Sequence, residues 1–251
     1  MKKQFSVLLV VIFCVLSFNA FADDVIPNEL VAIGEHGTVL EGYMPCEVAD
    51  PACDASVLRR ISISPFFIQK YEVTLGQLKS CFDEGICKNE QLKKHMDSYL
   101  KNGKYSLNAA FVMEREYAES YCADNGMRLP KPEEWLYAAM GAEIKSYPWG
   151  NEITEGEYAP HPKTVGAVTS NPFDVGSYPK DYSVHGIYDM AGNVSEWVDG
   201  PRMGVFVEGA KCGVPYTWPA MGHVEVVKIY ERFGLGYDDS HKVGVRCVKD
   251  N

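Results

Sequence analysis

The fold of this chain is decided by the stretch HGIYDMAGNVSEWVDG, residues 185–200. Aromatic, acidic and glycine residues follow one another in it without the alternation of a strand, and two glycines are poorly tolerated in a helix. Gly186 and Gly192 favour backbone conformations with positive φ, which are typical of loops. The sequence therefore predicts a loop that ends in a short strand at Glu196–Val198.

Two interpretations of this loop fit its composition. In the first, oxygen ligands encircle a hard cation such as Ca²⁺; they are the side chains of Asp189 and Glu196 and the carbonyls of Met190, Gly192 and Val194. In the second, the loop is held only by its own side-chain to backbone hydrogen bonds. Composition alone favours the hydrogen-bonded loop.

The N-terminus has the pattern of a secretory signal peptide. Lys2 and Lys3 precede an apolar run at Val7–Leu16, and Ala20-Phe21-Ala22 matches a cleavage site. The run is shorter than the roughly 20 residues that a membrane span needs, and no later stretch is long enough. We therefore expect residues 1–22 to be removed and residues 23–251 to be soluble. The short, lysine-bearing signal is typical of bacteria, which predicts a periplasmic or secreted protein.

The composition indicates a globular, acidic protein. Hydrophobic residues make up 46% of the chain and aromatic residues 12%, enough for a sizeable core. Removing Lys2 and Lys3 takes the formal net charge from −10 to −12. Such a charge disfavours nucleic acid and anionic lipid as partners. No repeat, linker or charge block divides the chain, so we expect one domain over residues 23–251.

Seven cysteines follow the predicted signal peptide. In an oxidising compartment most of them should pair, and an odd number leaves at least one without an intramolecular partner. Two pairs are close in sequence and favour local disulfides: Cys46 with Cys53, and Cys81 with Cys87. The chain lacks the C-x₂-C spacing of a zinc site, and its six histidines are scattered.

Three helices are indicated by their end signals. Thr74 and Gln77 form a capping-box pattern that begins the first, and Gly85 ends it. A second covers about Met113–Asn125. A third begins at Pro132 and ends at Gly141. Strands are predicted within residues 25–44 and 58–71, and the polar segment Lys88–Lys104 is interpreted as an irregular surface excursion.

Six segments, in order and spacing, resemble the family of formylglycine-generating enzymes, or sulfatase-modifying factors. They are FFIQKYEVT (66–74), SYCADNGMRLPKPEEWLYAAMG (120–141), YPWGNE (147–152), VGSYP (175–179), GIYDMAGNVSEWV (186–198) and GVRCV (244–248). The resemblance covers nearly all of residues 23–251. It implies an α+β, C-type-lectin-like fold, rich in loops, with small twisted antiparallel sheets and two or three helices.

The resemblance also implies specific site residues. The family's disulfide between its YC and GFRC motifs falls on Cys122 and Cys247, which leaves Cys212 as the odd thiol. The calcium-binding loop of some members falls on residues 189–196 and reverses the preference stated above. The expected cofactor is then structural calcium, and its ligands are Asp189, Met190, Gly192, Val194 and Glu196.

The catalytic pattern of the family is incomplete in this chain. Active members carry two neighbouring cysteines that bind copper, for which paired thiolates suit Cu(I). The corresponding segment, Val207–Phe233, holds Cys212 alone, with Tyr216 or Thr217 where a second thiol is needed. Copper is therefore not expected. The iron-dependent branch uses an additional histidine-bearing domain, which we do not expect here.

Two functions of different classes follow from this pattern. The first is an exported, non-catalytic binding or regulatory protein, an accessory of a secretion or envelope system. Its partner would be another periplasmic or outer-membrane-associated protein, bound through Lys88–Lys104 and the aromatic-rich Pro201–Lys242. The alternative is an oxidoreductase acting on a peptidyl cysteine or a small periplasmic metabolite, with Cys212 as its reactive thiol. Carbohydrate binding is a third option that the fold permits and no residue demands.

Overall fold

The computed structural model describes residues 25–34, 37–41, 59–142, 148–150, 172–190, 193–199 and 243–251. The predicted signal peptide, Gly192, and the segment Pro201–Lys242 with Cys212 lie outside these ranges. The elements, in chain order, are β1 (Leu30–Ile33), β2 (Gly37–Glu41), β3 (Arg59–Ile63), β4 (Phe66–Gln69), α1 (Leu75–Asp83), α2 (Glu90–Asn102), α3 (Arg115–Asp124), α4 (Pro132–Met140), β5 (Ser195–Glu196), β6 (Val243–Gly244) and β7 (Val248–Asp250).

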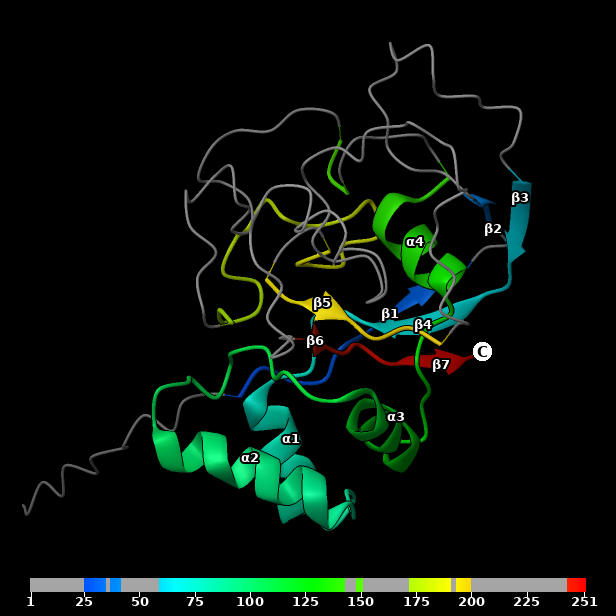
Figure 1. Ribbon diagram of the computed structural model, residues 1–251. Helices are drawn as coiled ribbons and strands as arrows, with labels where there is room; N and C mark the ends of the chain where they lie inside the picture. The colour runs from blue at the N-terminus through cyan, green and yellow to red at the C-terminus, as the bar shows by residue number, and fades with distance from the viewer. Residues whose placement is uncertain are drawn as a thin grey trace, which may run out of the picture.

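In the described part of the chain, three short sheets connect its strands. The first is antiparallel with the order β1-β4-β7, so β4 lies between the N-terminal strand and the C-terminal strand. A second antiparallel pair joins β2 to β3, and a short parallel pair joins β5 to β6. Figure 1 shows α4 on one side of the three-stranded sheet and α1, α2 and α3 on the other. The α+β, loop-rich fold expected from the sequence is confirmed.

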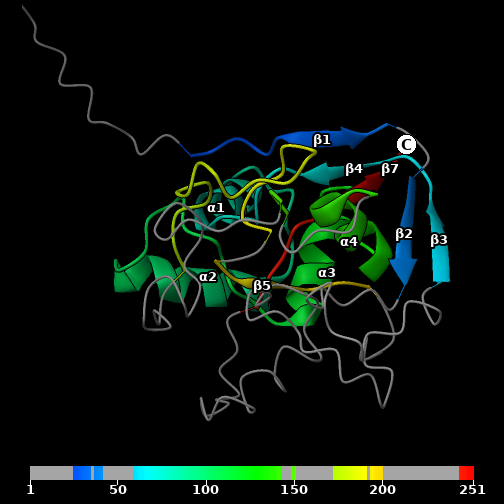
Figure 2. The same cartoon turned by 90° about the horizontal axis from the view of Figure 1, so that it is seen from above.

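The two sides of the sheet carry separate apolar clusters. Trp135, Ala138 and Ala139 of α4 pack with Phe66 and Ile68 of β4 in one of them. The other lies among α1, α2 and α3, which Figure 2 shows from above. Ile33, Phe66, Ile68 and Val248 of the sheet belong to the first cluster, so the face towards α4 is the buried one, whereas Leu30, Ala32 and Lys249 are exposed.

The first helix begins where the sequence predicts. The backbone N–H of Gln77 donates to Thr74 Oγ1 at 3.1 Å, and the N–H of Thr74 donates to Gln77 Oε1 at 3.2 Å. This reciprocal pair satisfies two backbone donors that would otherwise be unpaired in a buried position. Gly85 follows the helix with φ of 71°. Both predicted ends of this helix are confirmed.

The segment Lys88–Lys104 contains a regular helix, so its interpretation as an irregular excursion is wrong. Asn89 accepts from the N–H groups of Gln91 and Leu92, at 3.0 and 3.1 Å, and so caps α2. Gly103, with φ of 65°, ends the helix. Only Leu92 and Met96 are fully buried along it. An apolar stripe this narrow is easily missed among charged residues.

Among the described residues, two disulfides link helices α1 and α3 to other parts of the chain. Cys81 and Cys87 are bonded at the end of α1, with an S–S distance of 2.05 Å. Cys122 of α3 is bonded to Cys247, across a sequence separation of 125 residues. Both pairings agree with the sequence-based expectation.

The third expected disulfide falls on residues that the structure does not describe. Both Cys46 and Cys53 belong to the segment between β2 and β3, of which residues 42–58 lie outside the described ranges. The bond between Cys46 and Cys53 therefore stays a prediction from their short spacing. Among the described residues, no helix is long and apolar enough to cross a membrane.

Candidate functional site

The loop that follows His185 takes the left-handed backbone conformation at several positions. Gly186 has φ of 76°, as its glycine predicts, whereas Asp189 and Asn193 adopt φ of 60° and 61° although they carry side chains. Asp and Asn tolerate this conformation better than most residues, because their short side chains bond locally. The strand predicted at Glu196–Val198 lies one residue earlier, at Ser195–Glu196, where it pairs with β6.

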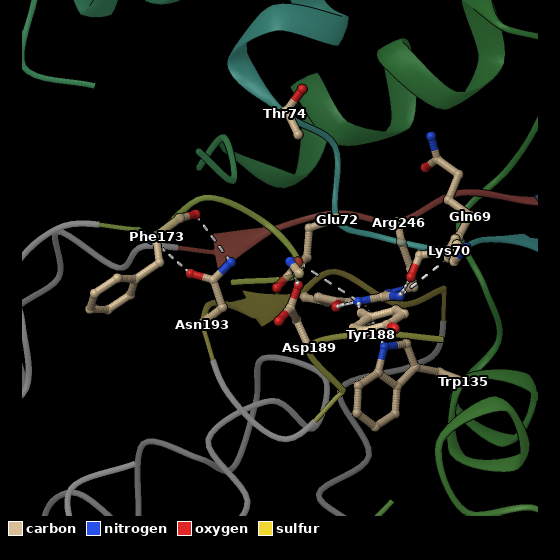
Figure 3. Close-up of polar contacts among 12 residues, drawn as sticks. Gln69, Lys70, Glu72, Thr74, Trp135, Phe173, Tyr188, Asp189, Asn193 and Arg246 are labelled. Atoms are coloured by element: carbon tan, nitrogen blue, oxygen red, sulfur yellow. Dashed lines mark hydrogen bonds and ion pairs between the residues drawn. The ribbon is translucent and has the colours of Figure 1, made fainter. Parts of the chain in front are cut away.

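Polar side chains tie this loop to its neighbours. Asn193 Oδ1 accepts from the N–H of Phe173 at 2.9 Å (Figure 3). Asp189 Oδ2 accepts from the N–H of Gly176 at 2.6 Å. The N–H of Tyr188 donates to the carbonyl of Lys70 at 2.9 Å. The side chains of Asp189 and Asn193 therefore fasten the loop to other segments of the chain and not to the loop itself.

A buried ion pair between Arg246 and Glu196 lies at the end of this loop. Arg246 Nε donates to both oxygens of Glu196, at 2.9 and 2.8 Å, and Nη2 donates to Oε1 at 2.8 Å. Both side chains are fully buried. Trp135 Nε1 adds a hydrogen bond of 2.7 Å to Glu196 Oε2. Glu196 is thus held by a charge-assisted fork and one neutral donor.

The remaining donors of Arg246 go to backbone carbonyls. Nη1 donates to the carbonyls of Gln69 and Lys70, at 3.3 and 3.2 Å, and Nη2 donates to the carbonyl of Tyr188 at 2.9 Å. One side chain therefore joins the end of β4, the loop and β5. Sequence reasoning did not select Arg246 as a site residue. The available signal was a charged residue between Val245 and Cys247, where the surrounding residues are apolar.

Two further carboxylates lie beside this pair. Glu72 is fully buried, its Oε2 lies 4.0 Å from Arg246 Nη2, and its carboxyl group lies within hydrogen-bonding reach of that of Asp189. Burial raises the pKa of Glu72 well above its usual range, and the neighbouring charge of Asp189 raises it further. Burial likewise raises the pKa of Asp189 to about 6. Figure 3 shows these two side chains next to each other.

The predicted calcium ligands are only partly placed to hold an ion. Glu196 fits poorly, because Arg246 and Trp135 already occupy both of its oxygens. Asp189 retains an oxygen that does not accept from Gly176. Within the described ranges, no group of three or more His, Cys, Asp or Glu side chains is arranged to hold a metal. Gly192 lies outside these ranges, and the calcium site stays a prediction.

The described cysteines leave no thiol for chemistry. All four of them are in disulfides; they are Cys81, Cys87, Cys122 and Cys247. The segment Val207–Phe233, with Cys212, lies outside the described residues, as do Cys46 and Cys53. Any thiol reactivity would therefore have to come from the cysteines that the structure does not describe.

Known proteins share this architecture. The family model of the sulfatase-modifying factor enzyme 1-like domain matches residues 27–251. A solved structure of PvdO from Pseudomonas aeruginosa superimposes with a TM-score of 0.54 at 19% identity, covering 88% of this chain and 94% of that one. At this identity the superposition shows a shared fold.

Two curated relatives differ in what their names say of activity. A hercynine oxygenase of Mycobacterium tuberculosis is 39% identical over 121 residues, which are 46% of this chain and 23% of that protein. An inactive Cα-formylglycine-generating enzyme 2 of Bos taurus is 37% identical over 89 residues, 32% of this chain and 29% of that protein. The matched stretches thus span less than a third of either relative.

Proposed function

The chain belongs to the family of sulfatase-modifying factor enzyme 1-like domains, and on this premise we propose that it is an exported, non-catalytic binding or regulatory protein. Its partner, in this proposal, is another protein of the periplasm or outer membrane. The family includes a relative named as an inactive enzyme, so the scaffold is compatible with a role that needs no catalysis.

The observation that carries the proposal is the cysteine content of one segment. Residues 200–242 hold a single cysteine, Cys212. The copper chemistry implied by the family resemblance needs two neighbouring thiolates, since paired soft ligands suit Cu(I). The four described cysteines cannot supply the missing thiol, because each is in a disulfide.

The buried ion pair supports the same conclusion. Arg246 and Glu196 are enclosed, and their donors and acceptors are directed at each other, at Trp135 or at backbone carbonyls. Groups held in this way stabilise a scaffold and do not reach a substrate. We therefore assign this buried ion pair a structural role.

The test of catalysis is a peptide assay. The purified protein would be incubated with a sulfatase-type peptide containing cysteine, with and without copper, and the peptide analysed by mass spectrometry. We expect no loss of the cysteine sulfur. Turnover that Cys212→Ser abolishes would overturn the proposal in favour of a formylglycine-generating oxidoreductase.

The test of binding uses periplasmic extract. Tagged protein would be used to retain partners, with an excess of untagged protein as competitor. We expect one envelope protein to be retained and then displaced by the competitor. Retention of the same proteins by an unrelated acidic protein would contradict a specific role.

A further inference from the structure

The helix α2 lies in a basic segment of an acidic protein. Residues 88–104 include five lysines and two acidic residues, which gives this segment a formal charge of +3. The whole chain has a formal charge of −10, so the remaining residues together have −13. A local field of the opposite sign to the rest of a molecule attracts partners that the rest would repel.

The inner face of α2 is packed into the core. Leu92 and Met96 are 1% and 2% exposed and belong to the apolar cluster among α1, α2 and α3. The ring of Tyr99 meets that of Phe111 edge-on, with the ring centroids 5.0 Å apart. These contacts hold the backbone of the helix in place, so a partner that binds its outer face does not have to order it first.

Lys94 and Lys101 lie on the outer face of this helix. At about 100° per residue, two positions seven residues apart differ by about 20° around the helix axis, and both of these are nearly opposite Leu92 and Met96. Two turns, or about 10 Å, separate them along the axis. Both residues are exposed. Figures 1 and 2 show α2 at the periphery of the described structure.

Most lysines of this segment have no carboxylate partner. Lys93 has one, because its Nζ donates to Asp97 Oδ2 at 3.0 Å. The other four are exposed and make no ion pair within the described part of the chain; they are Lys88, Lys94, Lys101 and Lys104. Exposed lysines are common on protein surfaces. This group is distinguished by its gathering along one fixed helix of an otherwise acidic chain.

We propose that the outer face of α2, with Lys94 and Lys101 at its centre, docks on an acidic surface of a partner protein. The inference rests on the binding function proposed above and names its surface and the chemistry of its partner. Opposite charges steer two proteins together and raise the rate of association, and added salt weakens the effect. The partner should present aspartate and glutamate side chains along about 20 Å, the length of a helix of 13 residues.

An anionic membrane is the competing occupant of this face. A helix that binds a lipid surface directs its apolar side chains into the lipid. In α2 the apolar side chains of Leu92 and Met96 are buried in the core instead. An extended anionic surface also repels the negative charge of the remaining chain, whereas a compact acidic patch on a protein contacts α2 alone. Both observations favour a protein partner.

The first experiment uses a defined probe, a fluorescent poly-glutamate peptide. Its binding to the purified protein would be measured by anisotropy at increasing salt concentration. We expect saturable binding at low salt that weakens steeply as salt is added. Vesicles of phosphatidylglycerol and phosphatidylethanolamine in equal parts would be tested in parallel by cosedimentation, and we expect no binding to them.

The deciding variant combines Lys94→Glu with Lys101→Glu. We expect its affinity for the poly-glutamate probe to fall by about tenfold or more, because both outward charges are reversed. The milder pair Lys94→Gln with Lys101→Gln should have an intermediate affinity. The matched control combines Lys131→Glu with Lys249→Glu, which changes the net charge equally at exposed residues outside α2. It should bind the probe as the wild type does, and unchanged melting temperatures would show that the variants are folded.

The second experiment applies these variants to the retention of partners from periplasmic extract. The envelope protein retained by the wild type should be released by added salt. It should be lost with Lys94→Glu/Lys101→Glu and kept with the control variant. The difference between the two variants supports the docking, and retention by the wild type alone does not.

Three results would overturn the proposal. Equal probe affinity of Lys94→Glu/Lys101→Glu and the control would place the attraction for anions elsewhere. Vesicle binding that the charge reversal abolishes would assign α2 to a membrane. Retention of the same envelope protein by both variants would leave the binding function intact but move it to another surface. By contrast, a wild type that retains no protein would contradict the binding function itself, and with it this docking.

Discussion

Arg246 holds the carboxylate of Glu196 in a fork that spans fifty residues of sequence. Both side chains are fully buried, and Arg246 reaches from Glu196 to the carbonyls of Gln69, Lys70 and Tyr188. A buried pair of this kind is strongly destabilised by loss of one partner, because the other is left as an uncompensated charge.

Arg246→Met should therefore lower the free energy of unfolding by about 3–5 kcal/mol, as judged by urea denaturation. Arg128→Met is the matched control. Arg128 also forks a carboxylate, that of Glu134, but its side chain is 32% exposed. Its loss should cost about 1 kcal/mol, because solvent screens the pair. Equal losses of unfolding free energy in the two variants would contradict the expectation that burial makes the Arg246 pair more important for stability.

The two disulfides among the described residues should contribute unequally to stability. Cys122–Cys247 closes a loop with a sequence separation of 125, and Cys81–Cys87 one with a separation of 6. Chain entropy predicts losses of about 5 and about 2 kcal/mol when each pair is replaced by alanines. Thermal or urea unfolding of the two double variants measures the difference. A larger loss for the short loop would show that local packing outweighs chain entropy here.

Tyr121 should make the protein sensitive to alkali. Burial raises the pKa of Tyr121 from 10.0 to about 12. Between these values the unfolded chain ionises this phenol and the folded chain does not, so the free energy of unfolding falls as pH rises. This loss of unfolding free energy reaches about 2–3 kcal/mol by pH 12.

The variant Tyr121→Phe removes this contribution. Its stability should decline less steeply than that of the wild type from pH 10 to 12, as measured by urea unfolding at each pH. Tyr182→Phe, at a residue that is 45% exposed, controls for the loss of a hydroxyl group. Parallel curves for Tyr121→Phe and the wild type would contradict the assignment.

Export is the prediction on which the proposed function most depends. The full-length chain, expressed in a Gram-negative host, should be found in the periplasmic fraction with Asp23 as its first residue. N-terminal sequencing provides the measurement. Lys2→Glu with Lys3→Glu should retain the protein in the cytoplasm, because the signal needs its positive region. A periplasmic protein that still begins at Met1 would contradict cleavage.

Local signals predicted much of the fold. Thr74 and Gln77 are three residues apart, and the side chain of each accepts a hydrogen bond from the backbone N–H of the other, so their capping box can be recognised from the sequence. Pro132 and Gly141 likewise mark the ends of α4. The pairing of Cys122 with Cys247 came from family resemblance, since nothing local connects residues so far apart.

The centre of the molecule could not be predicted in this way. Glu72, Glu196 and Arg246 come from three separate segments, and their burial depends on how those segments pack. The loop alone shows the acid Glu196 but not its partner, because Arg246 lies fifty residues further on in the sequence. The helix α2 was missed for a local reason, since only Leu92 and Met96 are fully buried among its charged residues.

The parallel pairing of β5 with β6 has a consequence for how this protein can change. Ser195 is paired with Val243 and Glu196 with Gly244. The N–H of Asp199 donates to the carbonyl of Pro130, so the chain is still fastened just before residue 200. The described chain therefore ends at Asp199 and resumes at Val243 close to the same strand pair. Any segment that connects these two residues has to meet one condition at this end of the fold, which is that its two ends fit the positions set by the β5-β6 pair.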